Sequence, residues 1–282
     1  MIADHETNVV FVADTLERRF PDVYRGLASI LRDHAIPLRT IPGTRQIWVR
    51  DFLPIHVAED RFVQFRYEPD YLTGKYRRLR ADGETGPTLP WLNWCRRSEI
   101  VLDGGNVVGW GDKVILTEKL LAENPMWERR KLLRELERLL EVDRIVLIPP
   151  EPGDVTGHAD GVVRFVDDVT VVVSDYRRID RNYRRAVLRR LKDASLGIRE
   201  LPYRPVSESS EGMPSAIGNY VNFLQVRGLI VLLIYGFAED DHSWDVLART
   251  FPGSLVATLD CRELASHGGV LNCASWSIKT VF

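Results

Sequence analysis

The sequence predicts an α/β protein in which five ββαβ units form a ring with fivefold pseudo-symmetry, an α/β propeller. Three observations support this class. Pairs of apolar strands recur about every fifty to sixty residues, a helical stretch and a further strand follow most pairs, and a short polar cluster precedes each pair. Repeats of this length are typical of propellers and solenoids. A two-layer α/β sandwich is the alternative, but it would leave the equivalent positions of the polar clusters to coincidence.

The strand pairs are predicted from short polar turns between β-branched runs, which is the sequence pattern of a hairpin. The pairs begin near residues 51, 103, 160, 222 and 272. The last pair is shortened, and the first four have their turns at Glu59-Asp60, Gly111-Asp112, Asp167-Asp168 and Arg227-Gly228.

Helices are predicted at residues 20–33, 127–140, 183–191 and 243–251, each followed by a strand. The second helix carries leucines at 132, 133, 136, 139 and 140, which form one stripe along a helix. Near the N-terminus a strand at 9–13 precedes helix 20–33, and a strand at 36–40 follows it. We therefore expect the first repeat to be circularly permuted, with hairpin 51–67 pairing against the two ends of the chain.

Two segments without periodicity, 68–97 and 203–217, are rich in Pro, Gly, Ser and Arg. We expect long loops over one end of the ring, since long loops in a compact domain are more often functional than idle. The aromatic residues of the first loop fit either a lid or a contact between subunits, so a homo-oligomer stays open. We expect residues 1–282 to form a single domain.

The composition argues against several classes of partner. A net charge of −2 gives no general attraction to nucleic acid or to an anionic membrane. The longest apolar run, residues 229–235, is far shorter than the roughly 20 residues of a membrane span. Three cysteines without a signal peptide predict no disulfide framework and favour a reducing compartment. We therefore expect a cytoplasmic protein that binds neither nucleic acid nor membrane.

The polar clusters contain a thiol and an imidazole. Cys273 follows Gly268-Gly269, and glycines allow a ligand to approach the backbone closely. A cysteine in this apolar stretch would by itself be a core residue, and only its place in the repeat makes it a candidate nucleophile. His158 and Asp160, two residues apart, would share one face of an extended strand, leaving His158 free to act as acid and base. The other histidines form no ligand cluster, so we expect no metal.

Three carboxylates occupy the same clusters, at Asp51, Asp103 and Asp160. Each alone would be an ordinary turn residue. Together in one cavity they would be costly unless a cation entered. A guanidinium group is planar and offers five donors, which two carboxylates can bind bidentately. The clusters thus predict a cysteine nucleophile beside a site for a cation.

Five stretches carry a resemblance to a known family: IWVRDFLP, VLDGGN, DVTGHADGVVRFV, NYVNF with LIVLLIYG, and LDCREL followed by SHGGVLNC. In content and order, from about residue 45 to 275, they resemble the agmatine deiminases and bacterial peptidyl-arginine deiminases, which are guanidino-group-modifying enzymes. The resemblance implies the fivefold α/β propeller (pentein) fold. It also implies hydrolysis of a guanidino group to a ureido product and ammonia, without a cofactor or a metal.

Matching positions imply roles for these residues. Cys273 resembles the family nucleophile, His158 the general acid and base, and Asp103 an acid that positions the histidine or the substrate. Asp51 and Asp160 resemble the carboxylates that hold the guanidinium. By this analogy the thiolate attacks the guanidinium carbon, ammonia leaves, and water hydrolyses the thiouronium adduct. The other substrate-binding residues we expect are Trp48, Arg50 and Asn222.

The sequence departs from the family pattern in stretches expected around the substrate tail. ASWSI follows residue 273 here where the family has Thr or Ser and glutamines, His267 stands where a Trp-Gly pair is common, and EPDYLTGK replaces a Trp-Gly-Gly stretch. The partner therefore stays open between small guanidines and an arginine-containing peptide. Among the small guanidines, free arginine-like compounds stand beside agmatine, which would link the protein to putrescine and polyamine synthesis.

Two other functions stay open from the sequence. An amidinotransferase would use the same residues but pass the amidino group to an amine instead of water. A non-catalytic guanidine-binding protein would keep the fold alone. The intact set of Cys273, His158, Asp160 and Asp51 argues against the second alternative.

Overall fold

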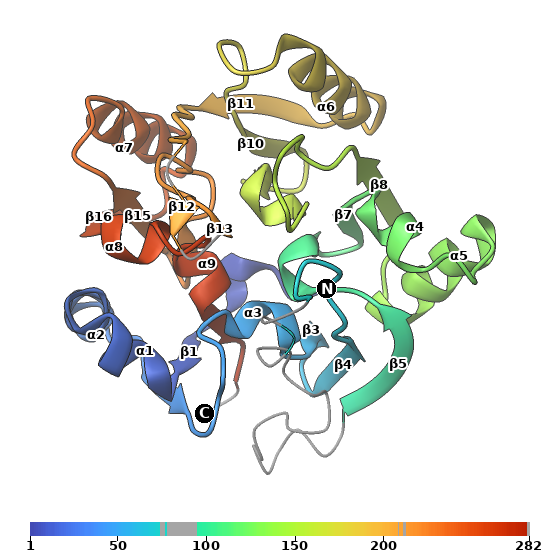
Figure 1. Ribbon diagram of the computed structural model, residues 1–282, viewed down its shortest axis with the longest axis horizontal. Helices are drawn as coiled ribbons and strands as arrows, with labels where there is room; N and C mark the ends of the chain where they lie inside the picture. Colours follow the sequence, from blue (N-terminus) through green and yellow to red (C-terminus); the bar gives the residue numbers. More distant parts are fainter. Residues whose placement is uncertain (74–76, 78–94, 208, 211–212, 281–282) are drawn as a thin grey trace.

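Five three-stranded sheets surround a common centre in the computed structural model, which describes residues 1–73, 77, 95–207, 209–210 and 213–280 (Figure 1). In each sheet an antiparallel pair of strands is extended by a third, parallel strand. In four sheets the connection to the third strand carries helices, and in the fifth it includes residues 74–76 and 78–94, which lie outside the described residues. The predicted repetition of hairpin and parallel strand is confirmed.

The strands agree with the predicted hairpins, although β5 begins inside the predicted loop 68–97. Gly111 and Gly228 have φ angles of 53° and 69°, the left-handed conformation that tight hairpin turns require. A two-stranded sheet of β12 (Ser209–Ser210) and β13 (Met213–Pro214) lies within the predicted loop 203–217. The five larger sheets are formed by β3 (Ile55–Ala58), β4 (Arg61–Arg66) and β5 (Cys95–Val101); β6 (Val108–Trp110), β7 (Lys113–Thr117) and β8 (Arg144–Ile148); β9 (Val163–Phe165), β10 (Thr170–Ser174) and β11 (Gly197–Leu201); β14 (Leu224–Val226), β15 (Leu229–Ile234) and β16 (Leu255–Asp260); and β17 (Ser275–Ile278), β1 (Val9–Ala13) and β2 (Leu38–Ile41).

The longer helices lie on the outside of the ring (Figure 1). Three of them contact the third strand of a neighbouring unit: α2 contacts β16, α6 contacts β8 and α7 contacts β11. These contacts join neighbouring units of the ring. The leucine stripe of α5 is buried at four of its five positions, which removes apolar area from water. The helices outside the ring and in its connections are α1 (Asp14–Arg19), α2 (Pro21–Asp33), α4 (Lys119–Glu123), α5 (Arg129–Leu140), α6 (Arg181–Asp193), α7 (Glu239–Thr250) and α8 (Arg262–Ala265). The short helix η1 (Asp4–Glu6) precedes β1 and contacts β14.

The two ends of the chain pair with each other, which corrects one prediction. Strand β17 runs antiparallel to β1, with Trp276 opposite Phe11, and β2 completes that sheet. Hairpin β3–β4, predicted to pair against the chain ends, instead pairs with β5. The permuted unit is therefore the one built from both termini, because β17 supplies the first strand that the N-terminal segment lacks.

A single turn of helix precedes four of the five antiparallel strand pairs and holds or adjoins four of the five polar clusters. These turns are α3 (Val49–Phe52), η4 (Gly104–Asn106), η5 (Ala159–Gly161) and α9 (Leu271–Ala274). His158 caps η5 and Asp160 lies within it, so the predicted extended strand at these residues is wrong. Cys273 lies in α9, just before β17. A helical turn points consecutive residues in different directions, so neighbouring side chains can reach both the cavity and the surrounding scaffold.

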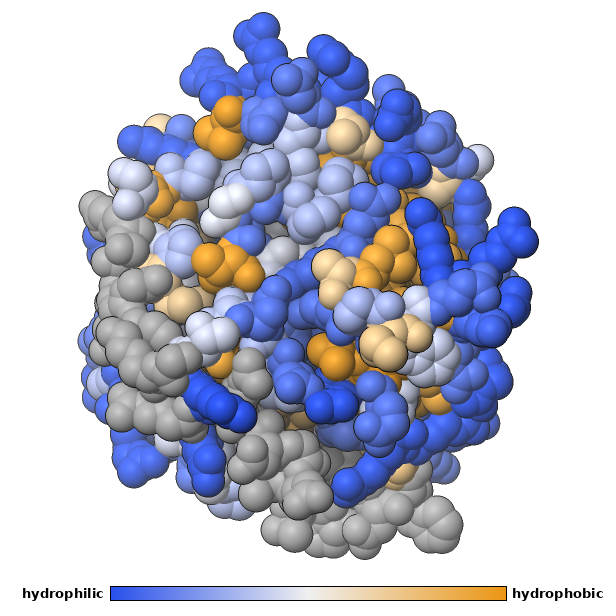
Figure 2. Space-filling model, turned by 45° about the vertical axis from the view of Figure 1, so that its right-hand side comes forward, coloured by the Kyte–Doolittle hydropathy of each residue, from blue (hydrophilic) through white to orange (hydrophobic). Residues whose placement is uncertain are grey.

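Apolar side chains on the face shown in Figure 2 occur in small groups among hydrophilic residues. Among the described residues, no helix is long and apolar enough to span a membrane.

Candidate active site

A cavity of about 300 Å³ is lined by residues from four of the five polar clusters. This is the lower end of the usual size of small-molecule sites. The predicted residues that it brings together are Trp48, Asp51, His158, Asp160, Asn222 and Cys273. Asp103 and Arg50 are not among its lining residues. Asp103 binds His158, which lines the cavity, and Arg50 donates to the carbonyl of Asn272, which precedes Cys273.

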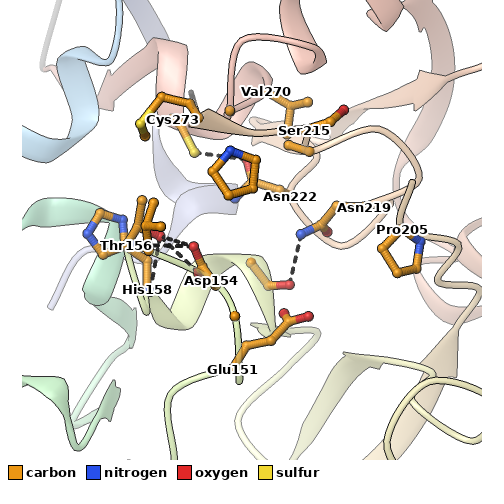
Figure 3. A pocket seen from close by; sticks show the side chains of 18 of the residues that line it. Glu151, Asp154, Thr156, His158, Pro205, Ser215, Asn219, Asn222, Val270 and Cys273 are labelled. Carbon is orange, nitrogen blue, oxygen red and sulfur yellow. Dashed lines mark hydrogen bonds between the residues drawn. The ribbon is translucent and has the colours of Figure 1, made fainter. Parts of the chain in front are cut away.

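Cys273 is half-buried on one wall of this cavity. Its thiol donates to Asn222 Oδ1 at 3.3 Å and lies 3.9 Å from Asp160 Oδ2 (Figure 3). Burial, with the charges of Asp160 and Asp51, raises the pKa of the Cys273 thiol well above its usual value. In the ligand-free site the sulfur is therefore a thiol, and it requires a nearby positive charge to ionise.

His158 is buried between carboxylates. Its Nε2 lies 3.0 Å from Asp103 Oδ2, and its Nδ1 lies 3.6 Å from Asp51 Oδ1. Burial opposes protonation, but the charges of Asp51, Asp103 and Asp160 outweigh burial and raise the pKa of His158 to about 10. The imidazole is therefore protonated at neutral pH, with Nε2 anchored on Asp103 and Nδ1 next to Asp51, which lines the cavity. A proton held in this way can be delivered to a ligand.

Asp51 lies on the cavity wall next to Nδ1. Burial and the charges of Asp103 and Asp160 raise its pKa to about 7, against the opposing effect of His158. The backbone N–H of Gly105 donates to Asp51 Oδ1 at 3.1 Å. A Cβ atom at Gly105 would lie 2.5 Å from His158 Nδ1 and 2.7 Å from Asp51 Oδ1. The glycine following Asp103-Gly104 is thus required for the two side chains to approach each other.

Asp160 is held by a residue that the sequence analysis did not single out. Asn272 Nδ2 donates to Asp160 Oδ2 at 2.6 Å, while Arg50 Nε donates to the Asn272 carbonyl at 2.7 Å. Arg50 lines a separate small cavity beside Asp4, so it supports α9 from behind. The available signal for Asn272 was its position directly before Cys273.

The ring of Trp48 packs against Gly269, the second glycine of the pair before Cys273. A Cβ atom at Gly269 would lie 2.7 Å from the Trp48 ring, so only glycine leaves room for it. The sequence predicts that these glycines allow the close approach of a ligand. At Gly269 the group that approaches closely is the Trp48 side chain, which then forms part of the cavity wall.

A second acidic group lies on the side of the cavity away from Cys273 (Figure 3). Glu151 accepts hydrogen bonds from the hydroxyls of Tyr176 at 2.7 Å and Tyr203 at 2.6 Å. Burial raises the pKa of Glu151 to about 7, although both tyrosines oppose the shift. Asp154 also lines this side. Glu151 is not predicted from the sequence. The only indication of its place in the cavity is that it lies near the His158 cluster in the sequence.

The side chains of the described residues do not form a metal centre. No group of three or more His, Cys, Asp or Glu among them could hold a metal ion. What the cavity offers is a set of acceptors, a thiol and one proton donor. That arrangement suits a flat cationic ligand more than a metal.

We expect the affinity of the cavity for a guanidinium ion to fall as the pH is lowered through about 7. Asp51 becomes neutral in that range and loses its attraction for the cation. The loss of the negative charge of Asp51 should weaken the binding of guanidinium by up to about tenfold per pH unit below 7. Calorimetric titration with methylguanidine between pH 6 and pH 8 measures this, and an affinity that does not change with pH would contradict the placement of Asp51 in the binding site.

Comparison with known proteins gives a consistent result. The sequence pattern of the Porphyromonas-type peptidyl-arginine deiminases matches residues 1–278. An agmatine deiminase of Stutzerimonas stutzeri is 27% identical over 267 residues, which is 80% of this chain and 72% of the relative. The solved structure of C. jejuni agmatine deiminase has a TM-score of 0.80 at 15% identity, covering 98% of this chain and 94% of that chain. A DDAH from Pseudomonas aeruginosa has a TM-score of 0.60 at 12% identity, covering 96% and 99%. The structural likenesses confirm the predicted pentein fold.

Proposed function

The chain belongs to the Porphyromonas-type peptidyl-arginine deiminase family, and on this premise we propose that it hydrolyses a guanidino group to a ureido group with release of ammonia. The observation that carries the proposal is the position of Asp160, whose Oδ2 lies 3.9 Å from Cys273 Sγ. A guanidinium bound to this carboxylate presents its central carbon to the sulfur. The relatives and their structures do not favour an amidinotransferase or a non-catalytic binding protein.

The reaction runs in two stages at one carbon. Cys273 Sγ forms a bond to the guanidinium carbon, and His158 Nδ1 gives its proton to the departing nitrogen, which leaves as ammonia. The resulting thiouronium adduct is attacked by water, whose proton His158 accepts. The carbon–sulfur bond then breaks as the remaining hydroxyl proton of the adduct passes to the sulfur, which releases the ureido product and restores the Cys273 thiol. A covalent intermediate divides one difficult displacement into two easier ones.

Substrate binding explains how a thiol with a raised pKa can react. Asp51 and Asp160 disfavour the Cys273 thiolate in the empty cavity. A guanidinium between them adds a positive charge next to the sulfur and offsets both carboxylates. Because an opposite charge within about 4–6 Å favours an ionised form, the thiolate is formed when the substrate is present.

The remaining site residues orient these groups. We assign Asp51 and Asp160 to guanidinium binding and Asp103 to holding His158 by its Nε2. Asn222 fixes the sulfur through its Oδ1. Two further assignments complete the set: Trp48 forms the wall that packs against the substrate, and Arg50 positions α9 without touching the substrate.

The far side of the cavity favours agmatine as the substrate. Glu151 and Asp154 line it, whereas no lysine or arginine lines the cavity among the described residues. A carboxylate on the substrate, as in free arginine, would meet like charge there. A terminal ammonium group would be attracted, and several relatives of this chain are named agmatine deiminases. We also propose that the chain forms a single domain and is located in the cytoplasm. Its partner is a small molecule, and it binds neither nucleic acid nor membrane.

Replacing Glu151 by glutamine should lower kcat/KM for agmatine by about tenfold to a hundredfold, the worth of a hydrogen bond to a charged group. Pentylguanidine, which has a methyl group in place of the ammonium, should lose little from the same substitution. Release of ureido product from both compounds measures the difference, with Glu135→Gln, which pairs with Arg138 on the outer helix α5, as the matched control. Equal losses on the two compounds would contradict binding of the ammonium at Glu151.

The proposed function itself is tested with the wild-type protein and a panel of agmatine, arginine and a short arginine peptide. We expect ammonia and a ureido product, fastest from agmatine. Added amines should not be converted to guanidines. Absence of turnover on the whole panel by a folded protein would overturn the proposal.

A further inference from the structure

One lysine outside the cavity lies largely buried beside His158 and Asp103, the acid–base pair of the proposed mechanism. It has no role in the reaction described above. Lys119 opens α4, two residues after the end of β7. Its side chain is only 10% exposed, and its Nζ lies 3.0 Å from Asp70 and 2.9 Å from Glu123. A lysine so little exposed is rare unless it is paired, and these two carboxylates pair it.

Lys119 connects to His158 through an aromatic ring. Its Nζ lies 5.0 Å from the centre of the Tyr71 ring, within the range of a cation–π contact. The Tyr71 hydroxyl is 3.4 Å from Asp103 Oδ2, the oxygen that also binds His158 Nε2. The Tyr71 ring meets the imidazole edge-on, with centroids 6.3 Å apart. Tyr71 therefore contacts both members of the acid–base pair.

The backbone next to His158 is held from the same direction. Gly157 has a φ of 59°, and a Cβ atom there would lie 3.1 Å from Lys119 Cδ, so the lysine stem packs on this glycine. The Thr117 hydroxyl donates to the Gly157 carbonyl at 2.6 Å. The end of β7 and the start of α4 thus fix the residue that precedes His158.

The charges around these groups are unevenly distributed. Lys119 faces Asp70, Glu123 and Asp103, and Asp103 helps to raise the pKa of Lys119. The groups facing His158 are Asp51, Asp103, Asp160 and Tyr71. Lys119 is therefore a fixed cation near a cluster of carboxylates.

We propose that Lys119 is a positioning residue with two effects. It holds the Tyr71 side chain in contact with Asp103, and its positive charge limits the proton affinity of His158. This inference rests on the proposed deiminase function for its kinetic part only. Without Lys119, the Tyr71 ring loses the ammonium group that holds it in place, and the positive charge near Asp103 disappears. His158 then binds its proton more tightly. A more tightly held proton is transferred more slowly to the departing nitrogen, whereas the residues that bind guanidinium stay in place.

The test compares Lys119→Met with Lys119→Arg, Tyr71→Phe and Lys113→Met. Lys113, at the start of β7, pairs with Asp168 and serves as the matched control. We expect Lys119→Met and Tyr71→Phe to lower kcat by about tenfold and to leave KM within about twofold. Their effects should not add in the double variant, because the two side chains act through one contact. Lys119→Arg should recover most of the rate, and Lys113→Met should match the wild type.

A titration of the His158 ring by NMR on the ligand-free protein separates this inference from the proposed function. We expect its pKa to rise by about one unit in Lys119→Met and to stay unchanged in Lys119→Arg. This readout remains valid even if no guanidine is turned over. An unchanged His158 titration in folded Lys119→Met, or a loss that appears in KM alone, would overturn the inference.

Discussion

Replacing Cys273 by alanine is expected to abolish formation of the ureido product, with a loss in kcat of at least about 10⁴-fold. In the proposed mechanism the sulfur is the group that bonds to the guanidinium carbon, and no other thiol lines the cavity among the described residues. Water would have to displace ammonia directly, without a covalent intermediate. Ureido product and ammonia, measured together over several hours, give the residual rate.

The matched control for this variant is Cys261→Ala. Cys261 is fully buried, and it is not among the residues that line the cavity. We expect near wild-type turnover from it. Cys273→Ala should still bind agmatine in a calorimetric titration, since Asp51 and Asp160 remain. Substantial turnover by Cys273→Ala would show that the sulfur is not the nucleophile.

Replacing His158 by glutamine should lower kcat by about 10³-fold, within the range for loss of a general acid–base group. Glutamine keeps a polar side chain of similar reach, but it cannot carry a proton to the departing nitrogen or accept one from water. The substitution also removes a positive charge from between Asp51 and Asp103. Agmatine should therefore bind at least as well to the variant, and the loss should lie in kcat.

A second buried histidine provides the comparison. His56 lies in β3, where its ring stacks on Phe62 at 4.3 Å and its Nε2 contacts the Glu59 carbonyl. His56→Gln should change thermal stability more than kcat. If the two variants lost activity equally, the effect of His158→Gln would reflect damage to the fold and not the loss of proton transfer.

Much of the fold could be predicted because its signals are local in sequence. Polar turns between β-branched runs predicted the hairpins, and the leucine stripe at 132–140 predicted helix α5. The pairing of β17 with β1 could not be found in this way, because it joins residues from opposite ends of the chain. Likewise, the single helical turns before the hairpins are too short to show a periodicity.

The candidate site was predictable where a residue type repeats at equivalent points of the units. Cys273, His158 and Asp51 were found by that recurrence, and the structure places them around one cavity. Glu151 and Lys119 occur at no repeated position. Their significance depends on burial and on partners distant in sequence, such as Tyr203 and Tyr71, which only the folded arrangement reveals.

The central claim is that the guanidino group becomes covalently attached to Cys273 during turnover. The most direct measurement is mass spectrometry of the wild-type protein, quenched in acid during steady-state reaction with agmatine. We predict an adduct on the peptide containing Cys273, with the mass of the substrate less one ammonia. Accumulation of ureido product with no adduct at Cys273, or with the adduct at another residue, would contradict the mechanism.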